Sequence, residues 1–225
     1  MDENSSFIKY RKWTFKIMKL NPSRTLLGIG FIGATLFAYE AFTSNTVEDL
    51  GSTKKLASSG LSNDWKSGNV ILLIRHEERC DRSNNPCLGP DNGITASGSE
   101  RAKEAGVRLK AYFDLDNTDT FSSPTNRTVQ TSDFMLGRAS LLSDREAICG
   151  ADIVDKLLKH KTANRNLLVM THNTCMSDLI RTSGYKQSWN PEYGNLLFAK
   201  ISSNNEIQIV GKLNLDDLPK QPLSI

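Results

Sequence analysis

The chain has 225 residues, of which 38% are hydrophobic and 24% charged, and its formal net charge is +3. This composition is typical of a globular protein and excludes collagen-like, disordered and multi-span membrane classes. Residues 1–24 hold six basic and two acidic residues (+4), so the remaining 22 basic and 23 acidic residues sum to −1. A general nucleic-acid-binding protein should carry its positive charge on the folded domain. The charge distribution therefore argues against nucleic acid as a partner.

An uncharged apolar run over residues 25–39 follows the basic segment. Its length lies between the 7–15 apolar residues of a signal peptide and the roughly 17–25 of a membrane span. We therefore predict that residues 25–42 are either an uncleaved anchor in the inner membrane or a cleaved signal peptide. Residues 1–24 are the basic flank that stays cytoplasmic, and the rest of the chain lies across the membrane. A buried helix of a soluble protein is the less favoured alternative.

Residues 43–66 are rich in Ser, Thr, Asn and Gly and are predicted as a linker, with at most a short helical turn. Residues 67–225 are predicted as one folded domain. Two apolar runs in it, residues 70–75 and 167–171, are typical of strands buried on both faces.

The remaining pattern alternates between helices and strands. Thr95 is a suitable N-cap for the first of the helices, and the last two strands are predicted to form a hairpin. This alternation predicts an α/β three-layer sandwich with a mainly parallel central sheet flanked by helices. The expected helices cover residues 95–113, 126–136, 151–160 and 173–182, and the further strands cover 120–123, 195–201 and 206–213.

The three histidines of the chain are His76, His160 and His172. His76 and His172 each follow a predicted buried strand directly. Ligands of α/β sheets bind beyond the carboxyl ends of the strands, so both side chains are candidate site residues. His160 lies near the end of a predicted helix, where a cation is favourable, and it is not assigned to the site.

Phosphoryl transfer is the chemistry that these histidines suit. A neutral imidazole can attack phosphorus and form a covalent phosphohistidine. Arginine best neutralises the phosphoryl charge, because its planar fork matches two phosphate oxygens, and a carboxylic acid must protonate the leaving group. The arginines that flank the histidines or follow a third strand end are Arg75, Arg79, Arg82 and Arg127.

Four segments resemble, in the same order, the motifs of the histidine phosphatase (phosphoglycerate mutase-like) superfamily. They are ILLIRHEER, ITASG with Ala102 and Gly106 after it, SSPTNRTVQT, and VMTH. The resemblance implies that superfamily's fold and a catalytic site that needs neither metal nor other cofactor. It also implies a nucleophile, His76, a second catalytic histidine, His172, and phosphate ligands that comprise Arg75, Arg82, Arg127 and His172.

Further segments resemble one branch of the superfamily, the heptose-phosphate phosphatases of the lipopolysaccharide core. They are RHEERCDRSNNPCLGPDNGIT, the Cys149-Gly150 pair, and THNTC. This resemblance implies a periplasmic enzyme whose partner is a phosphorylated sugar of the lipopolysaccharide core. Two alternatives stay open, a phosphomutase and a non-catalytic phosphate-binding or envelope-interaction protein of the same fold.

The sequence departs from the superfamily pattern beside the nucleophile. Glu77 occupies the place of a glycine, and Glu78 follows it. Negative charge is unfavourable there unless it points away or pairs with an arginine. The acid is Glu146 or alternatively Asp152, of which we favour Glu146. Asn173 stands where another branch has an acidic aspartate, and it cannot donate that proton.

The cysteines number four, which allows three disulfide connectivities. We favour Cys80–Cys87 and Cys149–Cys175, because each pair would brace the rim of the predicted site. An even number of cysteines suits an oxidising periplasm. Free thiols of a cytosolic enzyme are a less favoured alternative, and the spacing lacks the C-x-x-C pairs of a zinc site.

Overall fold

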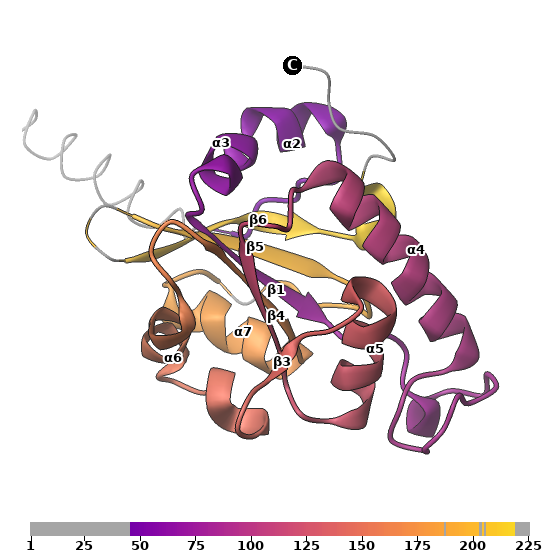
Figure 1. Ribbon diagram of the computed structural model, residues 1–225. Helices are drawn as coiled ribbons and strands as arrows, with labels where there is room; N and C mark the ends of the chain where they lie inside the picture. Colours follow the sequence, from indigo (N-terminus) through magenta and orange to yellow (C-terminus); the bar gives the residue numbers. More distant parts are fainter. Residues whose placement is uncertain (1–45, 187, 203, 205, 219–225) are drawn as a thin grey trace, which may run out of the picture. The chain divides into compact units, whose positions relative to one another are not determined.

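The computed structural model describes residues 46–218 apart from 187, 203 and 205 (Figure 1). The basic flank and the apolar run of residues 25–42 lie outside the described residues, so their expected roles stay predictions. Among the residues that are described, no helix is both long and apolar enough to cross a membrane.

A sheet of six strands in the order β3-β2-β4-β1-β5-β6 forms the centre of the domain. The first four strands run parallel to one another, β5 is antiparallel to β1, and β6 is antiparallel to β5. The predicted C-terminal hairpin is thereby confirmed. The strands are β1 (Val70–Arg75), β2 (Thr118–Ser122), β3 (Ser140–Leu141), β4 (Asn166–Thr171), β5 (Leu196–Ile201) and β6 (Ile207–Leu213).

The two central strands, β1 and β4, are apolar on both faces because helices cover both. In β1, Leu72 and Ile74 pack into one core cluster and Ile71 and Leu73 into the other, all with no exposed surface. Full burial of each such side chain stabilises the fold by roughly 1.5–3 kcal/mol. This explains why the period-two pattern of a one-sided strand is absent from the sequence.

Helices form the two outer layers (Figure 1). Helices α2 to α5 contribute to one core cluster and α6 and α7 to the other. The fold is therefore the predicted α/β sandwich with a mainly parallel sheet. The helices are α2 (Thr53–Ser58), α3 (Leu61–Lys66), α4 (Ala96–Tyr112), α5 (Asn126–Leu136), α6 (Ile153–His160) and α7 (Asn173–Thr182).

The segment predicted as a linker is folded. Leu56, Leu61 and Trp65 are at most 4% exposed, and the Trp65 ring lies 4.3 Å from that of Phe113. The indole N–H of Trp65 also donates to the Asp114 carbonyl at 2.8 Å. The two short helices contain only a few, widely spaced apolar residues. These residues are enough to hold the helices in place because the rest of the domain supplies the surface on which they pack. The domain boundary at residue 67 was therefore wrong, and the folded part includes α2 and α3.

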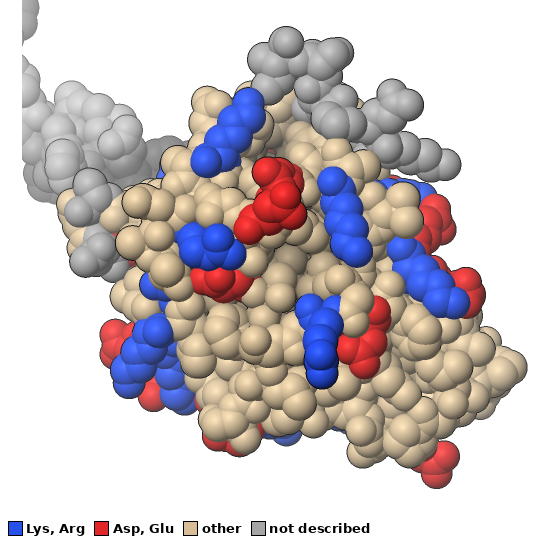
Figure 2. Space-filling view, in the orientation of Figure 1, with Lys and Arg blue, Asp and Glu red and all other residues tan. Residues whose placement is uncertain are grey.

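The bounds of the other predicted elements agree with the structure to within two residues, and the two-residue strand β3 was not expected. Thr95 caps α4 as predicted, because its hydroxyl accepts from the Gly98 N–H at 3.0 Å. On the face seen in Figure 2, the described acidic and basic side chains lie close to one another rather than forming a patch of one sign.

Candidate active site

The pairing of β1 with β4 brings the two candidate histidines together. Arg75 pairs with Thr171, so the next residue of each strand, His76 and His172, emerges at the same edge of the sheet. The His76 N–H donates to the Thr171 carbonyl at 3.1 Å, and the centroids of the two imidazoles are 5.4 Å apart. Both histidines are 2% exposed. Strand register alone therefore explains how residues 96 positions apart share a site.

The imidazole of His76 is oriented by the main chain. Its Nδ1 lies 2.7 Å from the Glu77 carbonyl oxygen, which can only accept, so Nδ1 carries the proton. Its Nε2 accepts from Nε of Arg127 at 3.2 Å. Burial holds the pKa of His76 well below its usual 6.5. The ring is therefore neutral at neutral pH, with a lone pair on Nε2, which is the form that a nucleophile needs.

The imidazole of His172 has different partners. Its Nδ1 accepts from Nη2 of Arg127 at 3.3 Å, so its Nε2 carries the proton and donates to the Ser123 hydroxyl at 3.0 Å. Burial, and after it the charge of Arg127, lowers the pKa of His172 to about 3. His172 also occupies the N-cap position of α7, where the helix dipole favours a bound anion.

Arg127 is the residue that joins the two histidines. It lies in the first turn of α5, whose start is tied to the turn after β1: Thr131 Oγ1 donates to the Arg127 carbonyl and accepts from the Glu77 N–H. Burial, and then the charge of Arg79, lowers the pKa of Arg127 to about 10. A fixed, partly desolvated guanidinium between two imidazoles is suited to a dianionic phosphoryl group.

Further arginines lie around this centre, among them Arg75. Burial is the main cause of the lowered pKa of Arg75. The guanidinium of Arg75 is 4.1 Å from the Tyr193 ring centroid. Sequence reasoning missed Tyr193, because no motif marks it. The other arginines whose charge acts on the pKa of Arg75, Arg127 or His172 are Arg79, Arg82 and Arg145.

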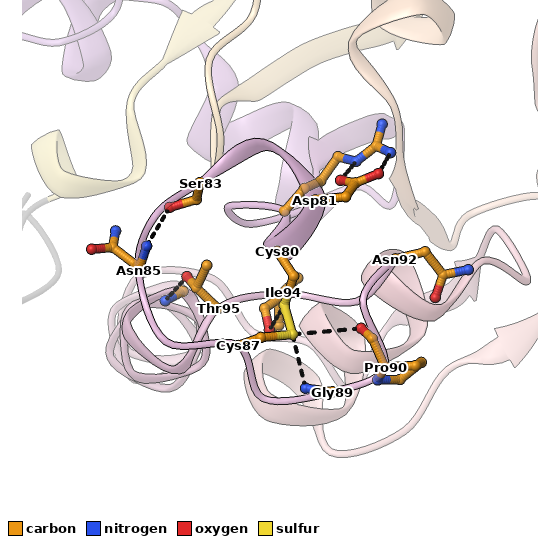
Figure 3. The surroundings of a disulfide bond; sticks show 12 residues. Cys80, Asp81, Ser83, Asn85, Cys87, Gly89, Pro90, Asn92, Ile94 and Thr95 are labelled. Atoms are coloured by element: carbon orange, nitrogen blue, oxygen red, sulfur yellow. Dashed lines mark hydrogen bonds and ion pairs between the residues drawn. A yellow bond between two sulfur atoms is a disulfide. The ribbon is translucent and has the colours of Figure 1, made fainter.

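The loop after β1 presents Arg79 and Arg82 and is closed by the Cys80–Cys87 disulfide (Figure 3). Arg79 forms a two-pronged ion pair with Asp81. Sequence reasoning named Arg79 among the arginines near the histidines but not among the phosphate ligands, and it missed Asp81, although its place beside Arg82 was a usable signal. The disulfide confirms the predicted pairing and holds this basic loop in one conformation.

The second predicted disulfide, Cys149–Cys175, is also confirmed. Cys175 lies in the first turn of α7, directly after His172 and Asn173–Thr174, and both cysteines are at most 3% exposed. Disulfides persist in oxidising compartments. The two pairs therefore indicate a location outside the cytoplasm.

Both acid candidates lie near the second disulfide. Glu146 belongs to a short 3₁₀ turn, Arg145–Ile148; its side chain is 69% exposed, and its nearest cation, Arg145, is 3.9 Å away. Asp152 is held by Lys156 at 2.9 Å, which lowers the pKa of the Asp152 carboxyl. No hydrogen bond or ion pair in the described part of the chain joins either carboxyl to His76 or His172.

The two glutamates after His76 turn away from the histidines. Glu77 is 1% exposed and lies 3.6 Å from Nε of Arg101 in α4. Glu78 accepts from the Asn85 amide at 2.8 Å and the Thr95 hydroxyl at 2.9 Å. The partner of Glu77 is thus an arginine outside the catalytic loop, which answers the objection that an acidic pair here would repel phosphate.

The remaining histidine, His160, packs against Phe121 at 5.0 Å between ring centroids, at the end of α6. Among the described residues, no group of three or more His, Cys, Asp or Glu side chains could hold a metal ion.

The fold and the paired histidines are those of a phosphatase of the histidine phosphatase superfamily. A mutant phosphoserine phosphatase from Entamoeba histolytica, solved with phosphoserine, has the same fold, with a TM-score of 0.51 and 14% identity over 67% of this chain and 99% of that chain. No family model matches the chain.

Sequence comparison identifies the family. The chain is 34% identical over 197 residues to the lipopolysaccharide core heptose(II)-phosphate phosphatase of Salmonella newport, covering 85% of this chain and 89% of the relative. The protein of the same name from Salmonella typhi is 34% identical over 196 residues, with the same coverage. The chain therefore belongs to this family, and the expected superfamily is confirmed.

Proposed function

We propose that this phosphatase is periplasmic and removes a phosphate from a heptose of the lipopolysaccharide core. The relatives that carry this name match 85% of the chain. The two disulfides support an oxidising compartment, and the apolar run of residues 25–42 supplies a route across the inner membrane.

The observation that carries the mechanism is the orientation of His76. With Nδ1–H held by the Glu77 carbonyl, Nε2 directs its lone pair at the position of Arg127. Nε2 attacks the phosphorus, an N–P bond forms, and the bond from phosphorus to the sugar oxygen breaks. The sugar oxygen leaves with a proton from the acid. Water then attacks the phosphorus and gives a proton to the carboxylate, the N–P bond breaks to restore the lone pair of Nε2, and inorganic phosphate leaves.

Charge stabilisation is assigned to the groups around His76. Arg127 reaches both imidazoles, and Arg75, Arg79 and Arg82 enlarge the positive potential for the dianion. A bound phosphoryl group would raise the pKa of His172, whose Nδ1 could then take up a proton and donate to a phosphoryl oxygen. Fixed donors of this kind act most strongly where charge develops in the transition state.

The acid is assigned to Glu146 rather than Asp152. The short turn that holds Glu146 also holds Arg145, whose charge acts on both Arg127 and His172. Asp152 is engaged by Lys156, and its lowered pKa makes it a weaker proton donor at neutral pH. The Glu146→Gln variant should therefore lose more activity than the Asp152→Asn variant on a sugar phosphate.

The test is phosphate release by the purified full-length protein from heptose-phosphorylated lipopolysaccharide, lipopolysaccharide without that phosphate, and p-nitrophenyl phosphate. We expect release from the first and third substrates, and an acid-labile phosphoryl group at His76 in quenched reactions. His76→Ala should be inactive and His160→Ala, the matched control, active. Phosphate binding without release by the wild type would favour the non-catalytic alternative, and activity on p-nitrophenyl phosphate alone would contradict the substrate assignment.

A further inference from the structure

Glu77 is a buried carboxyl group that the mechanism above does not use. It follows His76 directly, in the position where the superfamily motif has glycine, and its side chain is 1% exposed. Burial of a carboxylate is costly unless cations and hydrogen bonds compensate for it. One of its oxygens, Oε2, accepts no hydrogen bond. The free-energy cost of burying this carboxyl group, in the turn that carries the proposed nucleophile, indicates that the group has a physical role.

The backbone and the side chain of Glu77 have separate tasks. Its carbonyl accepts the Nδ1 proton of His76 at 2.7 Å, and its N–H donates to Thr131 Oγ1 at 3.0 Å. Its carboxylate lies on the other side, 3.6 Å from Nε of Arg101, whose Nη2 is 3.8 Å from Asp216 Oδ2. The ion pair therefore ties the turn that orients His76 to helix α4.

The Glu77 carboxylate also packs against the backbone of Gly194. A Cβ at that glycine would lie 2.7 Å from Glu77 Oε1, and the φ of +72° is in the left-handed region. The Gly194 N–H donates to the Arg75 carbonyl at 3.2 Å. The preceding residue, Tyr193, places its ring 4.1 Å from the Arg75 guanidinium and 5.8 Å from the His76 ring. Glu77 thus touches the segment that packs over two site residues.

We propose that ionised Glu77 is a positioning residue, whose ion pair with Arg101 holds the His76 turn and the Tyr193–Gly194 segment in the geometry that phosphoryl transfer requires. This inference rests on the proposed role of His76 as nucleophile. The negative charge is required, because a neutral carboxyl group of the same shape loses its attraction to Arg101.

The charge state of Glu77 changes near neutral pH. Burial raises its pKa to about 7, although Arg101 opposes the rise. The other charged groups that face it, Asp216 and the neighbouring Glu78, also raise it. As the pH falls through 7, Glu77 takes up a proton and releases Arg101. Activity should then fall with the fraction of ionised Glu77.

The experiment compares pH profiles of kcat/KM for p-nitrophenyl phosphate from pH 5.5 to 9. The proteins are the full-length wild type, Glu77→Gln, Arg101→Gln and the control Glu100→Gln, which removes an exposed charge from the same helix. The ionisation of the substrate is common to all four and cancels in the ratios. The ratio of wild-type activity to Glu77→Gln activity should fall about fivefold between pH 8 and pH 6, as one group of pKa about 7 requires when its protonated form keeps about a tenth of the activity.

The expected values distinguish positioning from simple packing. Glu77→Gln should be about tenfold below wild type at pH 8, with the loss in kcat and an unchanged KM, and equal to wild type near pH 5.5. Arg101→Gln removes the other member of the ion pair, so it should also be about tenfold below wild type at pH 8 and should not recover at pH 9, where Glu77 is ionised but has lost its cation. Glu100→Gln should follow wild type throughout.

A Glu77→Gln profile that matches wild type at every pH would overturn the inference. Activity that persists in His76→Ala would instead overturn the proposed function, so the two failures are distinguishable. Loss of the buried charge should leave the thermal stability of Glu77→Gln at pH 8 equal to or above that of wild type. If that variant fails to fold, Arg101→Gln still decides the question, because wild-type activity of Arg101→Gln at pH 8 would contradict the inference.

Discussion

The ends of β1 and β4 are alike in sequence and different in chemistry. Each strand is apolar, is buried on both faces, and leads into a histidine that is 2% exposed. At the end of β1 a backbone carbonyl fixes the His76 proton on Nδ1. At the end of β4 the Arg127 guanidinium, which can only donate, occupies Nδ1 of His172, so the His172 proton lies on Nε2 and is donated to the Ser123 hydroxyl.

In the proposed function, this difference suits the two histidines to different tasks. His76 offers Nε2 to the Arg127 guanidinium, and His172 offers Nδ1 to the same group. His76 leads into a disulfide-closed loop of arginines, whereas His172 begins helix α7. A strand followed by a basic loop suits attack on phosphorus, and a strand followed by a helix N-terminus suits stabilisation of an anion.

The largest effect is expected for His76→Ala, with a loss of at least about 10⁴-fold in kcat for phosphate release, because no covalent intermediate can form. Rapid-quench measurement of phosphoenzyme and product will check this. His160→Ala, which alters a histidine packed on Phe121, should remain close to wild type. Formation of phosphoenzyme at His172 instead of His76 would show that the proposed roles of the two histidines are exchanged.

Arg127→Ala should lose about 10³-fold in kcat/KM, because one guanidinium serves both imidazoles. Arg127→Lys should recover only part of this, since an ammonium group lacks the fork that reaches two partners. Steady-state kinetics on p-nitrophenyl phosphate will measure both. Equal activity of the lysine variant and wild type would contradict two-pronged binding.

His172→Ala should lose about 10²-fold in kcat, the cost of one fixed donor to the transition state. Unlike His76→Ala, it should still form phosphoenzyme at His76, only more slowly. Single-turnover experiments separate these outcomes. A complete absence of phosphoenzyme would show that His172 is needed for attack as well as for charge stabilisation.

The two disulfides should differ in what their removal costs. Cys149–Cys175 closes a separation of 26 residues, and Cys80–Cys87 one of 7. Chain-entropy arguments give about 3.5 and about 2.4 kcal/mol of stability respectively. Denaturant unfolding of the Cys149→Ser/Cys175→Ser and Cys80→Ser/Cys87→Ser variants will measure this. The second variant should lose relatively more activity, because its loop carries Arg79 and Arg82.

The smallest effect is on stability below neutral pH. His76 and His172 stay neutral in the fold, while unfolded histidine takes up a proton below about 6.5. Their stability contribution is therefore present above pH 6.5 and is lost as the pH falls. Glu77 has the opposite effect on stability. In the folded protein its raised pKa keeps the carboxyl group protonated up to about pH 7, whereas in the unfolded chain the same group releases its proton near pH 4.5.

Together these three groups correspond to a net difference of about 0.8 proton between the unfolded and folded states across pH 5 to 6.5, so the free energy of unfolding should rise by about 1 kcal/mol per pH unit in this window. Unfolding measurements over this window will test it. His172→Ala should flatten the slope, and Glu77→Gln should roughly double it. A slope of the same size in all three proteins would contradict the assigned charge states.

The sequence by itself determined the layers of the fold and the two histidines. Buried strands are recognisable as apolar runs, and helices by the periodic spacing of their apolar residues, because both patterns are local in the sequence. The positions of His76 and His172 at strand ends then followed from the rule that parallel strands present their carboxyl ends at one edge. The structure also confirms the favoured disulfide pairing, although the sequence alone allowed three connectivities and Cys149 and Cys175 belong to separate motifs.

Only the tertiary structure decided the rest. The helices α2 and α3 were read as a linker, because their few apolar residues acquire a partner surface only in the folded domain. The contacts of Glu77 with Arg101 and Gly194, and of Tyr193 with Arg75, join positions that are far apart in the chain. Side-chain orientation and proton position depend on such neighbours, and no local pattern encodes them.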